Sequence, residues 1–360
     1  GESGAPWTES IGLGEQGWRW MLAVEALPAI AYFLALFGVP ESPRWLVMQG
    51  RDDAAKAVVT RLRGPAQAEA LLVQVHDSLA AEEELGQVGF RALLHPSLRL
   101  VLTIGLAVGI LQQATGINAV FFYAPMIFEQ TGVGTNAAFM QAVLVGLVNL
   151  LFTVVAMTLI DKLGRRPLLG FGLGGITVCM LLLAYGFGTA TYKLDQQAID
   201  ALSADIDRAE IAAVVDTTFH SDVEFREAVR AAIGVEAYKA HESELVTAAI
   251  DANPWLILVA ILGFVASFAM SIGPIMWVLF SELFPNRVRG IAISFVGLVN
   301  SAVAFLVTLT FPWELETLGN SLTFLIFAGI ALVGMLFVMR ILPETKGRSL
   351  EELEALLARG

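Results

Sequence analysis

The sequence of 360 residues contains a single cysteine, Cys179, and few charged residues. One cysteine cannot form a disulfide within the chain, and it excludes metal sites built from several thiolates. Charged residues make up 16% of the chain against 56% hydrophobic residues, and mean hydropathy is +0.69, whereas soluble domains carry about 25% charged residues. The net charge of −12 argues against a nucleic-acid partner, although the acidic residues are concentrated in one polar insert. The composition predicts a protein whose partner is the lipid bilayer.

Several functional motifs are also missing from the sequence. It has no Walker loop and no paired-histidine metal motif, and no amino-terminal signal-peptide pattern. Gly170, Gly172 and Gly175 fit G-x-G-x-x-G, but they open an apolar segment instead of following a strand. Close helix packing therefore explains them better than dinucleotide binding. We expect no enzymatic activity, no catalytic residue, no cofactor and no metal.

Long apolar segments are the dominant feature of what is present. A membrane-spanning helix needs about 20 apolar residues, and strand-like alternation typical of a membrane barrel is not seen. The sequence predicts an all-α membrane protein with spans at roughly 18–39, 98–128, 137–160, 168–190, 255–284, 291–312 and 321–342.

Lysine and arginine residues predict how these spans are oriented, because cytoplasmic loops retain positive charge. Most of the 22 basic residues fall in the 40–97 connection, in the short turns after the third and fifth spans, and in the 343–360 tail. We expect those regions to be cytoplasmic, with amphipathic helices in 40–97. The 1–17 segment and the acidic insert 191–253 are then exterior. The insert is expected to form a small helical cap, since DVEFREAVRAAIG starts and ends like a helix.

The second span carries polar groups where apolar ones are expected. The stretch LQQATGINAVFFYAP contains Gln112, Gln113, Asn118 and Tyr123. At about 100° per residue, one straight helix cannot point all four into a bundle. A break at Gly116 would let them converge on one cavity, where amides can both donate to and accept from an uncharged polyol. The alternative is hydrogen bonding between helices, worth about 0.6 kcal/mol on average.

The fifth span shows the same features in SIGPIMWVLFSELFP. Pro274 removes a backbone donor and Gly273 permits close approach, so a discontinuous helix is expected. Trp277 could then serve as a platform for a sugar ring or simply pack in the core. Asn149 and Asn300 are single amides within apolar spans, where they either contact a ligand or join helices.

Five ordered motifs resemble the sugar porter family of the major facilitator superfamily. They are PESPRWL at 40–46, QQATGIN at 112–118, DKLGRRP at 161–167, SELFPNRVRG at 281–290 and PETKGRSLEELE at 343–354. The resemblance implies that 18–39 is equivalent to the family's sixth helix and that 98–342 is its carboxyl-terminal six-helix bundle. Five helices of the amino-terminal bundle would then be absent from this chain and would be its partner. As given, the chain is expected to bind sugar weakly and to transport nothing.

The same resemblance implies roles for individual residues. Sugar contacts are implied for Gln112, Gln113, Asn118, Tyr123, Asn149, Gly273, Trp277 and Asn300. Arg165, Glu282 and Arg289 match the family's cytoplasmic charge cluster, which Glu41, Arg44, Glu344 and Lys346 could join. Glu25 lies inside the first span, where an acid is either functional or close to the interface, and the resemblance implies proton coupling for it.

The residues of these motifs are similar to those of bacterial xylose and hexose–proton symporters. Ala269 stands where facilitative animal glucose transporters carry glutamate, which favours symport of a monosaccharide with protons in the bacterial inner (plasma) membrane. Asn300–Ser301 departs from the Gln–Trp of the xylose symporters, so pentose and hexose both stay open. A facilitative uniporter and a non-transporting sugar sensor are the alternatives, although a sensor would be expected to have a longer cytoplasmic tail.

Overall fold

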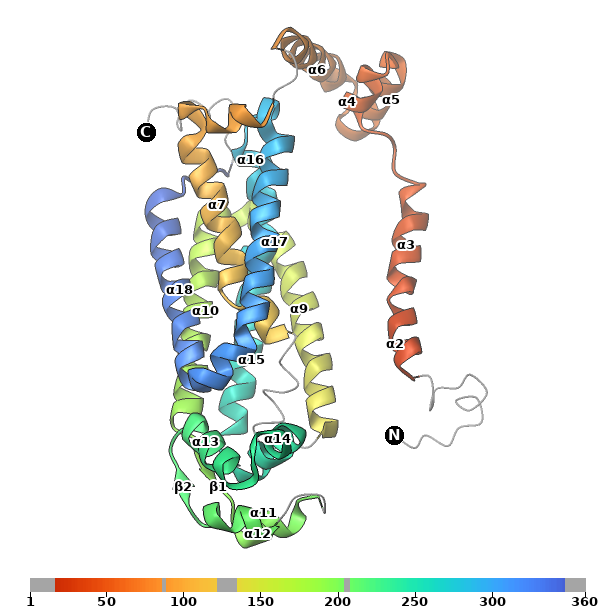
Figure 1. Cartoon of the computed structure of the whole chain (residues 1–360). Helices are drawn as coiled ribbons and strands as arrows, with labels where there is room; N and C mark the ends of the chain where they lie inside the picture. The colour runs from red at the N-terminus through yellow and green to blue at the C-terminus, as the bar shows by residue number, and fades with distance from the viewer. Residues whose placement is uncertain (1–16, 86–88, 122–134, 204–207, 347–360) are drawn as a thin grey trace, which may run out of the picture. The chain divides into compact units, whose positions relative to one another are not determined.

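The computed structural model describes residues 17–85, 89–121, 135–203 and 208–346, and these fall into two compact units. The first unit lies within 1–87 and the second within 88–360 (Figure 1). Residues 1–16 of the predicted exterior loop and most of the predicted tail 343–360 lie outside the described residues.

The first unit begins with an apolar helix that is broken near its start. Helix α2 spans Gly17–Val24 and α3 spans Ala26–Leu36, with Glu25 between them. Pro28 has no N–H to donate to the carbonyl of Val24, and α2 ends there. The apolar stretch Leu22–Leu36, which contains this interruption, is shorter than the predicted span 18–39.

Three further helices complete this unit: α4 (Pro43–Met48), α5 (Asp52–Arg63) and α6 (Pro65–Leu85). Leu46, Val47 and Ala55 form their small buried core. Gly64 ends α5 with φ +85°, a conformation that glycine adopts without strain. The described part of the 40–97 connection is thus largely helical, and the amphipathic character of its helices stays a prediction.

Among the described residues of the second unit, six helices are long and apolar enough to cross a membrane, as predicted for the last six spans. Two 3₁₀ turns (Phe90–Leu94 and Pro96–Leu98) lead into α7 (Arg99–Ala114), whose apolar run continues to Phe121. The others are α9 (Thr135–Leu163), α10 (Arg165–Gly188), α15 (Pro254–Met270) with α16 (Ile272–Leu283), α17 (Asn286–Thr317) and α18 (Gly319–Ile341). They surround one extended apolar core.

Glycine residues allow helices in this bundle to approach each other closely. A Cβ on Gly172 would overlap the Ser271 side chain, and one on Gly175 would overlap the Ser267 hydroxyl oxygen. A Cβ on Gly170 would meet the Met339 sulfur at 2.6 Å. All three glycines lie within α10. The glycine pattern thus serves helix packing, as expected, and does not open a nucleotide-binding helix.

The insert between α10 and α15 is a small α+β unit at one end of the bundle (Figure 1). Strands β1 (Thr191–Lys193), β2 (Thr218–Phe219) and β3 (Ile250–Asp251) form an antiparallel sheet of order β2-β1-β3. Its helices are α11 (Gln196–Ala201), α12 (Arg208–Ile211), α13 (Asp222–Ile233) and α14 (Val235–Ala249), with a 3₁₀ turn at Ala212–Val214. The purely helical cap predicted for 191–253 is corrected in this respect.

Helix α13 forms where the insert's sequence predicts it. Ser221, one residue before the predicted start, accepts a hydrogen bond from the Val223 N–H, and Gly234 ends the helix at φ +81°. The sheet was missed because strands of two or three residues are too short to show a period of two.

Candidate functional site

Helix α7 breaks within the amide-rich motif, as the sequence predicts. Gly116 adopts φ +86°, and the helix resumes at residues 117–121. A Cβ at Gly116 would lie 3.1 Å from two ring carbons of Phe327 on α18. Glycine therefore fits this position for two reasons, the positive φ and the close ring.

The fifth span is also discontinuous. The break falls at Ser271, with φ −129° and ψ −102°, between α15 and α16. Pro274 lies in the first turn of α16, where a missing N–H costs nothing. The Ser271 hydroxyl donates to the Ser267 carbonyl oxygen at 2.7 Å. The discontinuity predicted from Gly273 and Pro274 is confirmed, three residues before the proline.

Four amide side chains from α7, its continuation and α17 form one hydrogen-bonded network. Asn118 Nδ2 donates to Gln113 Oε1 at 2.9 Å, and Gln113 Nε2 donates to Asn300 Oδ1 at 3.2 Å and to Gln112 Oε1 at 3.1 Å. Asn300 Nδ2 also donates to Gln112 Oε1, at 2.8 Å. The break at Gly116 thus brings together side chains that a straight helix would separate.

Backbone carbonyls anchor both ends of this amide network. Gln112 Nε2 donates to the Gly273 carbonyl oxygen at 3.3 Å, in the first turn of α16. Asn300 Nδ2 donates to the Gly109 carbonyl oxygen at 2.8 Å, and the absence of a Cβ at Gly109 permits this approach because Val296 would lie 2.9 Å from it. Three helices and both breaks therefore meet at one polar centre.

The network is enclosed by apolar residues on one side. Gln112 and Asn300 are 6% exposed, and Met276 beneath them is fully buried, with its sulfur 3.8 Å from Asn300 Nδ2. Gln113 and Asn118 are half-buried. Burying unpaired amides is costly, and mutual pairing removes that cost. The partly exposed members leave the network one accessible edge.

The remaining predicted site residues are placed differently. Asn149 lies half-buried on α9 and Trp277 lies on α16, 51% exposed, with its ring edge against Phe280. Tyr123 falls outside the described residues. Glu25 is exposed at the α2–α3 break in the other unit. The structure thus brings together five of the eight predicted sugar contacts, counting the Gly273 carbonyl.

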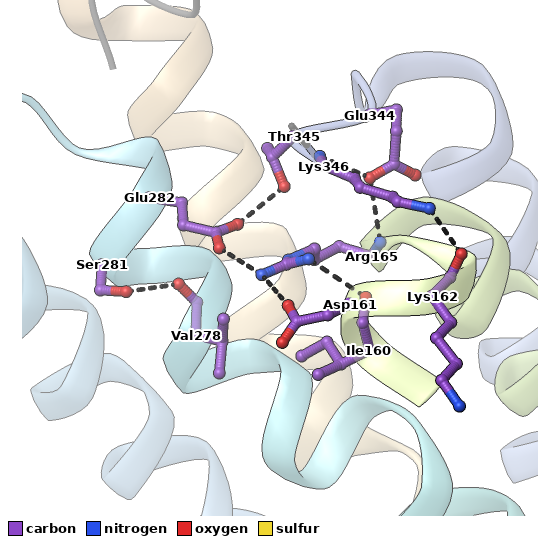
Figure 2. A network of polar contacts seen from close by, with 10 residues as sticks. All are labelled: Ile160, Asp161, Lys162, Arg165, Val278, Ser281, Glu282, Glu344, Thr345 and Lys346. Atoms are coloured by element: carbon purple, nitrogen blue, oxygen red, sulfur yellow. Dashed lines mark hydrogen bonds and ion pairs between the residues drawn. The ribbon is translucent and has the colours of Figure 1, made fainter. Parts of the chain in front are cut away.

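A second polar cluster joins the ends of α9, α10 and α16 (Figure 2). Arg165 Nη2 lies 2.7 Å from Glu282 Oε1 and 3.1 Å from Asp161 Oδ1, and its Nη1 donates to the Ile160 carbonyl oxygen at 3.1 Å. The Arg165 side chain is 10% exposed and that of Glu282 is 26% exposed. The predicted Arg165–Glu282 pair therefore forms with little competition from water.

The segment after α18 completes this cluster. Glu344 accepts hydrogen bonds from the N–H groups of Arg165 and Arg166, at 3.0 and 3.1 Å, and so caps α10. A Cβ on Gly164, whose φ is +95°, would lie 2.6 Å from a Glu344 carboxylate oxygen. A carboxylate at a helix amino terminus is also favoured by the helix dipole.

Other members of the cluster were predicted less well. Arg289 Nε donates to the Phe284 carbonyl oxygen at 3.1 Å, at the end of α16, so this residue binds backbone next to the cluster. Thr345 was missed, although it is buried and donates to Glu282 Oε2 at 2.8 Å. Its only sequence signal is its place beside Glu344 in the PETKG motif. Met276 was also missed, because one methionine in an apolar span carries no signal.

The family model described as sugar (and other) transporter matches residues 7–204 and 231–357. The arabinose-proton symporter of Bacillus subtilis (strain 168) is 35% identical over 344 residues, which are 94% of this chain and 60% of the relative. The D-xylose-proton symporter of Escherichia coli (strain K12) is 32% identical over 350 residues, covering 96% and 58%. The chain thus spans about 60% of the length of these relatives.

A solved structure of the proton:xylose symporter XylE, bound to 6-bromo-6-deoxy-D-glucose, has a TM-score of 0.67 and 30% identity, covering 96% of this chain and 60% of that one. These proteins are named as symporters, in agreement with the prediction that the chain is not an enzyme. The matched family model and the six apolar helices identify the chain as a member of the sugar transporter family of the major facilitator superfamily.

Proposed function

We propose that this chain is part of a transporter that carries a monosaccharide, a pentose or a hexose, together with protons across a membrane. The observation that supports this most strongly is the amide network of Gln112, Gln113, Asn118 and Asn300 between two broken helices. Ligand sites in transporters lie where discontinuous helices meet near the middle of the membrane.

The chemistry of the network suits an uncharged polyol. Each amide has a carbonyl oxygen and two N–H donors, and each sugar hydroxyl both donates and accepts. A bound sugar can therefore take the place of one amide partner without leaving a buried polar group unpaired, which would cost about 1–3 kcal/mol. We propose Gln112, Gln113, Asn118 and Asn300 as direct contacts, with the Gly273 carbonyl holding Gln112 in place.

Three further residues belong to the proposed site. Trp277 lies one turn after Gly273 on α16 and half of it is exposed, which is consistent with an aromatic platform under a sugar ring. Asn149 and Tyr123 stay predictions from the motif resemblance.

We propose alternating access by rocking of this bundle against a second one equivalent to the remaining length of the relatives. The Arg165–Glu282 pair and the Glu344 cap would hold the ends of α9, α10 and α16 together in one state and loosen in the other. The protein would then lie in the bacterial plasma membrane, with this charge cluster on the cytoplasmic side and the 191–253 insert outside.

Proton coupling is proposed because relatives of this chain are named proton symporters of arabinose and xylose. Glu25 is the coupling residue we propose within this chain, since an acid inside an apolar helix is by default functional. If sugar moved without any need for a proton gradient, the protein would be a uniporter.

The proposal is tested by uptake of radiolabelled xylose and glucose into proteoliposomes. The protein is this chain preceded by helices equivalent to those of its relatives, with Gln113→Ala as the site variant. Accumulation that requires a proton gradient and is lost in Gln113→Ala is the expected result. Sugar binding without any uptake would replace the transporter with a sugar sensor, and equal uptake by both forms would refute the site.

A further inference from the structure

The insert between α10 and α15 has a hydrophobic core of its own. Tyr192, Phe225 and Tyr238 are almost fully buried in it, and the Tyr192 and Phe225 rings stack with centroids 5.7 Å apart. Ile250 and Ala252 pack against both this core and that of the bundle. The insert is therefore a folded body that is continuous with the bundle, and not a loose loop.

Asp222 joins the insert to the start of α18. Its Oδ2 accepts a hydrogen bond from the Asn320 N–H at 3.0 Å, and its side chain is 9% exposed. Gly319, at φ +79°, leaves room for this carboxylate, because a Cβ there would lie 2.5 Å from Asp222 Oδ1. A helix amino terminus is thus capped by a residue from another structural body.

Arg230 joins the insert to the end of α17. It lies 2.5 Å from a carboxylate oxygen of Glu316, with the two side chains 22% and 46% exposed, and its guanidinium stands over the Tyr238 ring at 4.8 Å. Figure 1 shows α13, which carries both Asp222 and Arg230, at the end of the bundle where α17 and α18 meet. One short helix therefore holds both sides of the α17–α18 turn.

Several of the attachment residues lie in a part of the insert that the family model does not match. The family match leaves out residues 205–230, and that gap contains Asp222, Arg226 and Arg230. Arg226 lies 3.8 Å from Asp222 and 3.2 Å from Glu242, and its side chain is 5% exposed. This part of the insert thus carries buried charged contacts that hold α13 against α14.

A series of side-chain contacts connects the α17–α18 turn to the amide network. Phe311, near the end of α17, stacks on Phe327 of α18 with centroids 6.1 Å apart and an angle of 27° between the rings. Phe327 lies against Gly116, the residue at which α7 breaks between Gln113 and Asn118. Shifting the start of α18 would therefore move the ring that supports the break.

We propose that Asp222 and Arg230 are positioning residues for sugar binding, through which the insert fixes the α17–α18 turn and so the geometry of the amide network. The inference rests on the proposed function and adds a role for the insert to it. It predicts that loosening the attachment weakens sugar binding without removing any group that contacts the sugar.

The test measures xylose and glucose affinity of the purified protein by isothermal titration for Arg230→Ala, Asp222→Ala and Asp222→Asn. Coupling through packed side chains is worth about a twofold to thirtyfold change in affinity, so the two alanine variants are expected to raise Kd by that amount. Asn keeps an oxygen that accepts the Asn320 N–H, so Asp222→Asn is expected to stay close to the wild type. The matched control is Lys193→Ala, which removes an ion pair with Asp216 inside the insert.

A second experiment separates positioning from general loss of structure. The ends of the Arg230–Glu316 pair are partly exposed, so exchanging them as Arg230→Glu with Glu316→Arg should restore the affinity that either single change loses. Hydrogen exchange of the 105–121 segment should be faster in Arg230→Glu and return to wild type in the exchanged pair.

Three outcomes are distinguishable. If the wild type binds neither sugar, the proposed function fails. If the wild type binds and Gln113→Ala does not, while Arg230→Ala and Asp222→Ala bind like Lys193→Ala, the positioning role is wrong and the site stands. If Arg230→Ala and Asp222→Ala lower the sugar affinity, and the double variant Arg230→Glu/Glu316→Arg restores both affinity and protection from hydrogen exchange, the positioning role is supported.

Discussion

Replacing Gly116 by alanine should destabilise the protein and disable the amide network together. A non-glycine residue in the left-handed region costs roughly 1–2 kcal/mol, and Gly116 has φ +86°. Its Cβ would lie 3.1 Å from two carbons of the Phe327 ring, which is 3% exposed and stacked on Phe311. Overpacking of this kind adds about 1–3 kcal/mol. The combined loss is about 2–5 kcal/mol of unfolding free energy.

The matched control is Gly297→Ala on α17. Gly297 lies inside a helix, and a Cβ there would meet nothing within 4 Å. Alanine gains up to about 1 kcal/mol of helix propensity at such a position, so this variant should be as stable as the wild type or more so. Denaturant unfolding in detergent, followed by circular dichroism, measures both free energies.

The same Gly116→Ala change should weaken sugar binding. The break precedes residues 117–121, and the Asn118–Gln113 hydrogen bond of 2.9 Å depends on it. If Gly116→Ala unfolded at the same denaturant concentration as Gly297→Ala and bound sugar with wild-type affinity, the inferred strain and the role of the break would both be refuted.

Three further predictions concern other parts of the molecule. Glu282→Gln should lower the unfolding free energy by about 1–3 kcal/mol, because Arg165 is nearly buried and would keep its charge without its nearest carboxylate; an unchanged denaturation midpoint would contradict this. Gly172→Leu should prevent α10 from packing on Ser271, so it should yield little folded protein by size-exclusion chromatography, and a monodisperse, thermally stable variant would contradict the packing. Burial, with a smaller contribution from Asp222, raises the pKa of Tyr192 above its ordinary value; the neutral phenol then contributes stability below about pH 10 that is lost as pH rises further. Tyrosinate absorbance and loss of helical signal should therefore appear together above that pH in the wild type, and Tyr192→Phe should remove part of this dependence.

The helix breaks were predictable from sequence because single residues cause them. Gly116 and Pro274 act on their own backbone, so a local reading finds them without any tertiary contact. The four amides were predictable for a related reason, since several polar groups in one apolar span need partners. Which amide binds which could not be predicted, because the Asn300–Gln112 bond joins positions 188 residues apart.

The insert shows the opposite case. Its strands have only two or three residues, and its three-stranded sheet forms around Tyr192 and Phe225 rather than from any local pattern. The Asp222 cap on α18 joins positions 98 residues apart. Neither feature has a short-range signal, so the sequence predicted a helical cap with no defined attachment.

The first predicted span is helical over most of its length, with an interruption at Glu25. Hydrophobicity alone favoured a helix over 18–39, but Pro28 removes the donor that would have continued α2 past Val24. The same reasoning that located the break near Pro274 would have located this one.

The central claim is that the amide network binds a monosaccharide, and direct titration of xylose and glucose into the purified protein tests it. Gln113→Leu removes the residue that links Asn118 to Asn300, whereas Thr103→Val on the same helix removes only a hydroxyl bonded to the Arg99 carbonyl oxygen. The account predicts binding by the wild type and Thr103→Val and none by Gln113→Leu. Equal binding by all three would contradict it.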